Sequence, residues 1–185
     1  MKSVLISIKP KWCELIASGK KTIEVRKTKP KLETPFKVYI YQTKESKRRF
    51  LNDRFNSFHN GLSHHTQMGK VIGEFVCDGI IPISIEYSNP NSRIALKEFP
   101  YSCLTDKQII DYLGNGNQGY GWHISNLVIY DKPRDLREFK KINRDCWYAD
   151  LGLAKRDCPE CKNANCFLQK PPQSWLYVES EVDTE

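Results

Sequence analysis

The sequence predicts an α+β fold in which a mixed, mostly antiparallel, barrel-like sheet is interrupted by two or three short helices. Short apolar or alternating stretches typical of strands recur along the 185 residues, and turn residues separate them. The helical patterns do not alternate regularly with these strands. A doubly wound sheet needs such alternation, so we expect a barrel-like arrangement instead.

Strands are expected where apolar residues run together or alternate with polar ones. The predicted strands are Val4–Ile8, Thr22–Lys27, Phe36–Tyr41, Val71–Val76, Ile80–Ile83, Trp122–Tyr130 and Trp175–Val178. Pro82 restricts its strand to an edge or a bulge, and Pro133 is expected to end the longest strand.

Two helices are predicted from their ends. Pro10 suits the first position of a short helix, and Gly19 suits the left-handed position that follows one. Thr105–Gln108 has the form of a capping box, and the helix that it opens is expected to stop near Gly114. Residues Gly114–Gly121 are then expected to be a glycine-rich connector.

The bulk composition indicates one domain over residues 1–185, with an insertion at about 44–68 and a cysteine-rich appendage at about 140–170. Lys and Arg total 29 against 22 Asp and Glu, a net charge of +7, which favours polyanionic partners. Much of the excess lies in two basic runs, Lys20–Lys31 and Lys44–Arg54. The second is interleaved with phenylalanines, which suits phosphate contacts and base stacking but equally a solvated loop.

No apolar stretch approaches the ~20 residues that span a bilayer, so no membrane association is expected. Lys9 and Lys11 interrupt the first apolar run, which excludes a signal-peptide pattern and predicts a cytoplasmic protein. The seven cysteines are then expected to be reduced thiols or metal ligands. The sequence leaves the oligomeric state open.

The segment Thr22–Arg26 alternates polar and apolar residues. Thr22, Glu24 and Arg26 are expected on one face, beside Lys21. This face is either a solvated strand edge, whose charges oppose aggregation, or a functional surface.

The spacing Gly19-x-Lys21-x-x-Glu24-x-Arg26 resembles the signature of the ASCH domain, a branch of the PUA-like superfamily. Four further segments resemble elements of that family, the last two of them elements of phage and bacterial members: Ser7–Trp12, Gly69–Phe75, Gly119–Ile124 and Pro171–Trp175. The resemblance spans most of residues 1–180. It implies a PUA-like β-barrel associated with RNA and modified bases, with a cleft lined by the lysine, glutamate and arginine.

The resemblance also nominates ligand-binding residues. The family's region after the Gly-Tyr-Gly element borders the cleft, so Trp122 is expected to stack on a base and His123 to bond its edge. The alternative is that Trp122 belongs to the core and His123 is a polar residue with its partners satisfied. The full set of expected ligand-binding residues is Lys9, Lys21, Glu24, Arg26, Tyr41, Trp122, His123 and Ser125.

One PUA-like relative is an amidohydrolase that deacylates acetylated cytidine with a lysine, a threonine nucleophile and a glutamate. Its lysine matches Lys21, but its nucleophile falls at Glu24, where a carboxylate cannot replace a hydroxyl. Thr22 is the nearest hydroxyl on that face. If this chain has a catalytic site, its candidates are Lys21, Thr22 and Glu24.

A second constellation lies near the C-terminus, where three cysteines are spaced C-x2-C-x4-C and a fourth lies twelve residues upstream. Four thiolates at such spacings predict one tetrahedral zinc ion, with an iron–sulfur cluster or free thiols as alternatives. The four ligands are Cys146, Cys158, Cys161 and Cys166. The other three cysteines, Cys13, Cys77 and Cys103, lie in apolar contexts and are expected in the core.

Three functional hypotheses follow. The first is a module that binds RNA, single-stranded nucleic acid or a modified nucleotide through a basic cleft. The second is an amidohydrolase acting on an acylated nucleoside such as acetylated cytidine. The third is a transcription-related regulator that acts through protein contacts, with the cysteine-rich appendage as its docking surface.

Overall fold

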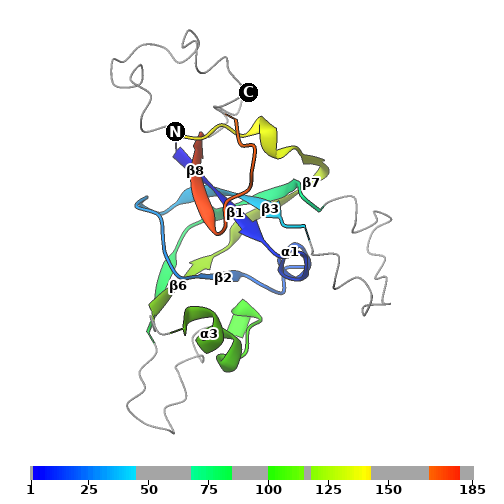
Figure 1. Ribbon diagram of the computed structural model, residues 1–185. Coiled ribbons are helices and arrows are strands. Elements are labelled where there is room, and N and C mark those ends of the chain that lie inside the picture. The colour runs from blue at the N-terminus through cyan, green and yellow to red at the C-terminus, as the bar shows by residue number, and fades with distance from the viewer. Residues whose placement is uncertain (1, 45–67, 85–99, 115–117, 143–166, 180–185) are drawn as a thin grey trace, which may run out of the picture. The chain divides into compact units, whose positions relative to one another are not determined.

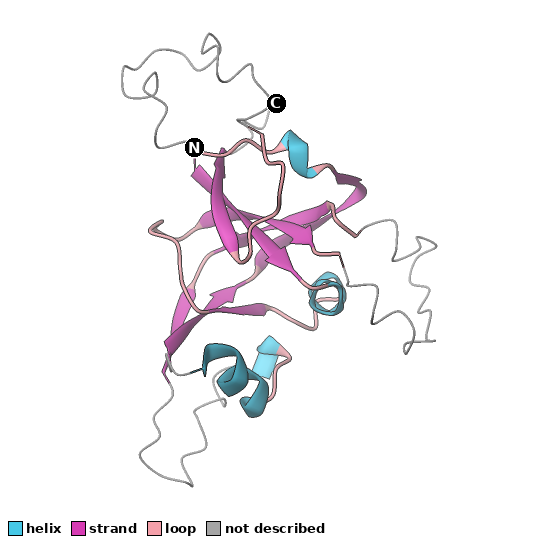
Figure 2. Ribbon diagram, in the orientation of Figure 1, coloured by secondary structure: helices cyan, strands magenta, loops and turns pink. Residues whose placement is uncertain are grey.

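The computed structural model describes residues 2–44, 68–84, 100–114, 118–142 and 167–179 (Figure 1). In chain order the elements are β1 (Lys2–Ile8), α1 (Pro10–Ala17), β2 (Ile23–Arg26), β3 (Phe36–Gln42), β4 (Val71–Cys77), β5 (Ile80–Ser84), α3 (Asp106–Leu113), β6 (Gln118–His123), β7 (Ser125–Arg134) and β8 (Trp175–Glu179). Strands dominate this part of the chain (Figure 2). The predicted α+β class with a mostly antiparallel sheet is confirmed.

The helix ends form as their sequences predict. Pro10 is the first residue of α1, and Gly19 adopts a φ of 71° just after it. At α3 the capping box closes in both directions, with Gln108 N donating to Thr105 Oγ1 at 3.3 Å and Thr105 N to Gln108 Oε1 at 3.0 Å. Gly114 then ends the helix with a φ of 64°.

Two predictions about the region after α3 are wrong. Residues Gly114–Gly121 are not all connector, because β6 begins at Gln118. The predicted strand Trp122–Tyr130 is broken at Ile124. The Ile124 N–H still donates to Thr22 O at 2.8 Å, in line with the β2–β6 pairing, and Asn126 then adopts a φ of 46°. The chain therefore forms two strands, β6 and β7, in different sheets.

Pro133 does not end its strand either, since β7 continues to Arg134. The reason is the position of β7 at one end of its sheet, which has the strand order β7-β4-β3-β1-β8. On an edge strand a proline's missing N–H need not remove a hydrogen bond from the ladder. The prediction that Pro82 lies on an edge is confirmed, because β5 ends the sheet β2-β6-β5.

The chain divides into two compact units, each built from segments that are distant in sequence. Unit 1 comprises residues 1–10, 39–73 and 130–185. Within it β1 pairs antiparallel with β8, and Ser7 Oγ donates to Pro172 O at 2.7 Å. Its core cluster contains Leu5, Tyr39, Tyr41, Val71, Leu136, Phe139, Leu168 and Val178.

Unit 2 comprises residues 11–38 and 74–129 and contains the antiparallel sheet β2-β6-β5. The helix α3 packs on one face of this sheet (Figure 1), where Ile109 and Leu113 join a buried cluster with Ile23, Val25 and Ile83. Alternation along β2 places Glu24 and Arg26 on the opposite face. The division into two compact units does not test whether residues 1–185 form one domain, so the single-domain prediction stays a prediction.

Several predicted features lie outside the described residues, namely most of the 44–68 insertion and the segment 143–166 of the appendage. Among the described helices, none is both long enough and apolar enough to cross a membrane. Cys13 and Cys77 are buried, as predicted, but Cys103 is only half-buried. Cys103 lies in the turn before α3 with a φ of 56°, and its Sγ contacts Lys20 O at 3.3 Å.

The close packing of α3 gives a test of the fold. A Cβ at Gly119 would lie 2.6 Å from Leu113 Cδ2 and 3.1 Å from Arg26 O. Because Leu113 is buried, it cannot easily move aside. We expect Gly119→Ala to lower the free energy of unfolding by about 1–3 kcal/mol in chemical denaturation.

Gly79→Ala is the matched control, since its Cβ would meet only His123 Cβ at 3.9 Å, an ordinary contact. Equal stability of the two variants would contradict the packing of α3 against β6.

Candidate functional site

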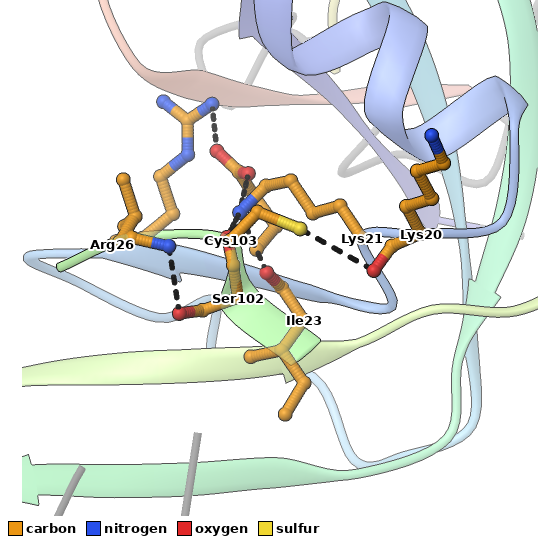
Figure 3. A network of polar contacts seen from close by, with 8 residues as sticks. Lys20, Lys21, Ile23, Arg26, Ser102 and Cys103 are labelled. Carbon is orange, nitrogen blue, oxygen red and sulfur yellow. Dashed lines mark hydrogen bonds and ion pairs between the residues drawn. The ribbon is translucent and has the colours of Figure 1, made fainter. Parts of the chain in front are cut away.

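Lys21 lies directly after the left-handed turn at Gly19, and its side chain is among the most buried in the chain, with 2% of the residue exposed. Its Nζ donates hydrogen bonds to Ile23 O at 2.7 Å and to Ser102 O at 2.6 Å (Figure 3). It also lies 3.3 Å from Glu24 Oε2. Two hydrogen bonds and one ion pair thus hold the ammonium in place.

Glu24 joins Lys21 to Arg26. Its Oε1 lies 2.9 Å from Arg26 Nη2, and both side chains are 8% exposed. The interpretation of this face as a solvated strand edge is therefore wrong, because all three charged residues are buried. We call Lys21, Glu24 and Arg26 the charged network.

The charged network combines two cations with one carboxylate. Removing charges from water costs several kcal/mol for each ion, and short contacts between opposite charges offset that cost. Here one carboxylate uses both oxygens, one toward each cation. With all three groups ionised, the network retains a net charge of +1 in a buried environment.

Two partners of Lys21 were missed in the sequence analysis. Trp12, on α1, lies with its ring centroid 5.4 Å from Lys21 Nζ and 4.9 Å from Lys11 Nζ, a cation–π arrangement. Its helical spacing with Leu15 and Ile16 indicated only an apolar face. Ser102 contributes its backbone carbonyl, which any residue type could supply, so no sequence signal identifies it.

Trp122 occupies the position expected of a core residue. It is fully buried, lies directly opposite Glu24 in the β2–β6 ladder, and makes an edge-to-face contact with Phe36 at 6.0 Å between centroids. Its indole therefore lies beside Glu24 on the same face of the sheet. It offers no exposed ring for a base.

His123 lies one residue further along β6, with its side chain 44% exposed. Its Nδ1 is 2.6 Å from Asp78 Oδ1. The hydrogen bond with His123 holds the pKa of Asp78 below its usual value, and Ser125 contributes in the same direction. Because an ionised carboxylate only accepts, Nδ1 carries the proton, and Nε2 is an acceptor in the neutral ring and a donor in the charged ring.

The remaining predicted site residues are placed as follows. Ser125 is half-buried and its Oγ donates to Val76 O at 2.9 Å. Thr22 is half-buried and its backbone N–H donates to Tyr101 O at 3.0 Å. Lys9 and Tyr41 belong to unit 1, where Lys9 is exposed and Tyr41 is a core residue. Burial raises the pKa of the Tyr41 hydroxyl, and Asp135 adds to the rise while Lys70 opposes it.

The predicted zinc ligands, from Cys146 to Cys166, lie outside the described residues, so the zinc site stays a prediction. Within the described ranges, no three His, Cys, Asp or Glu side chains gather closely enough to hold a metal ion. Burial raises the pKa of the Cys77 thiol to about 12, and it also raises the pKa of Cys13. These two described thiols are therefore protonated at neutral pH and are poor ligands or nucleophiles.

The strand-rich α+β fold is that of a small PUA-like module. More particularly, an ASCH-domain family model matches residues 6–109, more than half of the chain, so this chain belongs to the ASCH family. ASCH domains are PUA-like domains generally thought to bind RNA.

Solved structures support the fold. The crystal structure of ASCH from Zymomonas mobilis is 19% identical with a TM-score of 0.50, covering 97% of this chain and 89% of that chain. A single-site mutant of the same protein gives 18% identity and a TM-score of 0.55, covering 96% and 88%. These neighbours are PUA-like barrels, which confirms the predicted fold class. A search of curated proteins finds no match.

Because of the charged network, we expect substitution of Glu24 to destabilise the fold much more than substitution of Glu74, another glutamate of unit 2. Glu24→Gln removes the carboxylate that neutralises two buried cations, and we expect a loss of about 3–5 kcal/mol in the free energy of unfolding. Chemical denaturation followed by tryptophan fluorescence measures it.

Glu74→Gln is the control, because the Lys37–Glu74 pair (3.1 Å) has side chains 27% and 22% exposed. We expect its loss to be less than about 1 kcal/mol. Similar losses for both variants would show that burial of the charged network does not govern its energetics.

The Asp78–His123 contact predicts a pH-dependent contribution to stability. The folded pKa of Asp78 lies below the ordinary value of 3.8, so the contact stabilises the fold above that value and is lost as the pH falls through the lowered one. Asp78→Asn should therefore lower the free energy of unfolding at neutral pH by at most about 1 kcal/mol, seen as a lower melting temperature. In strong acid the variant and the wild type should melt at the same temperature.

Asp111→Asn removes the same charge from an exposed position of α3 and controls for net charge. A deficit of Asp78→Asn that persists undiminished into strong acid would contradict the assignment.

Proposed function

We propose that this protein is a nucleic-acid- or modified-nucleotide-binding module whose favoured partner is RNA. Membership of the ASCH family and the net charge of +7 support the proposal. The observation that carries it is the charged network, which keeps an excess positive charge inside the family's signature segment.

The excess charge matters because of where it lies. A positive charge in a low-dielectric environment acts on a nearby anion more strongly than a solvated charge does. The network is also fixed in position, since Lys21 is held by two carbonyls and Arg26 by Glu24. A phosphate or a base carbonyl that approaches unit 2 therefore meets a positive potential. Because the network's side chains are already fixed, binding there loses little side-chain entropy.

The same contacts favour a binder over the amidohydrolase alternative. A general base needs a free lone pair, but Lys21 Nζ donates to two buried carbonyls and pairs with the Glu24 carboxylate. Deprotonating it would leave one of these buried acceptors without its donor. The role that this geometry supports for Lys21 is to hold the turn at Ser102 and the end of α1 against β2.

His123 adds a group suited to a base edge. Its Nδ1 is committed to Asp78, while Nε2 has no hydrogen-bond partner among the described residues. An imidazole fixed in this way presents one acceptor or one donor in a set orientation, as base recognition requires. We assign it to the Watson–Crick or Hoogsteen edge of an unstacked base.

The proposal predicts salt-dependent binding of single-stranded RNA. In fluorescence anisotropy with a mixed-sequence oligonucleotide, log K should fall linearly with log salt, with a slope near −0.7 for each phosphate contacted. No binding at low salt would contradict the proposal. An affinity that does not change with salt concentration would indicate that the ligand is small and uncharged.

Release of acetate from acetylated cytidine tests the competing hypothesis in the same preparations. Turnover well above the uncatalysed rate, abolished by Lys21→Arg, would support the hydrolase. The arginine keeps a positive charge there but cannot act as a base at neutral pH.

A further inference from the structure

Two lysines that follow β2 lie over tyrosine rings. Lys27 Nζ is 5.5 Å from the ring centroid of Tyr112, and Lys29 Nζ is 5.4 Å from that of Tyr120. Both lysines are exposed, and Tyr112 is 39% exposed. We call these four residues the lysine–tyrosine platform. It lies outside the family's signature segment, which ends at Arg26.

The fold brings the platform together from three elements of unit 2. Tyr120 lies directly opposite Arg26 in the β2–β6 ladder, so its ring is on the face that carries the charged network. Tyr112 comes from α3, which packs on the other face of the sheet through Leu113, so the two lysine–tyrosine pairs flank the end of β2 from its two faces. The two lysines are two residues apart, so their Cα atoms lie within about 7 Å of each other.

The charges of the platform are not neutralised by the rest of the described chain. In that part of the structure neither Lys27 nor Lys29 forms an ion pair with a carboxylate. Lys37 and Lys70, by contrast, lie 3.1 and 2.7 Å from Glu74 and Asp135. An ammonium over a ring remains fully cationic. It can therefore bind a phosphate without first breaking an ion pair.

We propose that the lysine–tyrosine platform binds single-stranded RNA around the end of β2, with bases stacked on Tyr112 and Tyr120 and phosphates on Lys27 and Lys29. Aromatic rings accept any base, and lysines follow the backbone, which is the combination found in single-strand-binding proteins. A base that reaches a ring displaces the lysine above it, and the ammonium moves to the adjoining phosphate. This inference rests on the proposed function and assigns part of its surface.

The tyrosines are tested by removing and then restoring the ring. Tyr112→Ala should weaken binding of a mixed-sequence single-stranded RNA by about five- to 150-fold, because stacking of one base contributes about 1–3 kcal/mol. Tyr112→Phe keeps the ring and should bind like the wild type. Tyr120→Leu, chosen because Tyr120 is half-buried, should weaken binding to a similar degree. Thermal melting checks that each variant is folded.

The lysines are tested by the salt dependence. The double variant Lys27→Ala, Lys29→Ala should reduce the slope of log K against log salt by about 1.4, or about 0.7 for each lost phosphate contact. Lys140→Ala is the matched control, since Lys140 Nζ lies 5.5 Å from the Phe167 ring in unit 1. The control should leave the slope unchanged.

The outcomes separate this inference from the proposed function. If the wild type binds RNA and the platform variants bind equally well with unchanged slopes, the platform is wrong while the function stands. If the wild type binds no RNA, both fail. If inorganic polyphosphate competes as well as RNA and Tyr112→Ala has no effect, the surface recognises charge alone and the stacking assignment is overturned.

Discussion

One buried carboxylate holds the region around β2 in unit 2 together. Glu24 lies between Lys21 and Arg26 in a region where neither cation could remain charged alone without a large cost. Through Lys21 the same carboxylate fixes the chain after α1, and through Ser102 O it fixes the turn that precedes α3. Residues of the family's signature spacing thus hold the local structure of unit 2 together.

This arrangement separates two roles within unit 2. The charged network supplies a fixed positive potential, and its most buried members are committed to internal contacts. Groups that can meet a ligand directly are exposed elsewhere in unit 2, such as the imidazole of His123 and the lysine–tyrosine platform. A buried charge supported by exposed contact groups is an economical way to recognise a flexible polyanion, because only the exposed groups need to reorder.

The sequence predicted the structure best where a residue type favours one local backbone conformation. The left-handed turn at Gly19, the capping box at Thr105 and the alternation of β2 were all predictable, because each depends on local geometry. The break at Ile124 was not predictable, since the chain passes there from one sheet to the other, and each sheet pairs segments that are distant in the sequence. The strand character of Gln118–Gly121 was hidden by glycines, of which Gly119 is required by the approach of Leu113.

The candidate site shows the same limit. Alternation placed Glu24 and Arg26 on one face, but it could not show that the face is buried, because charged residues are ordinary on exposed strands. The acceptor at Ser102 is a backbone carbonyl, which every residue type has, so the sequence gives no signal for it. The pairing of Lys27 with Tyr112 depends on tertiary packing between β2 and α3, which no local pattern encodes.

The most direct test of the central claim, that unit 2 around β2 contacts RNA, is ultraviolet crosslinking of the protein to single-stranded RNA followed by mass spectrometry of the crosslinked peptides. The account predicts crosslinks at Tyr112, Tyr120 and the residues just after β2, and their loss in competition with unlabelled RNA. Crosslinks confined to unit 1, with these peptides recovered unmodified at saturating RNA, would contradict it.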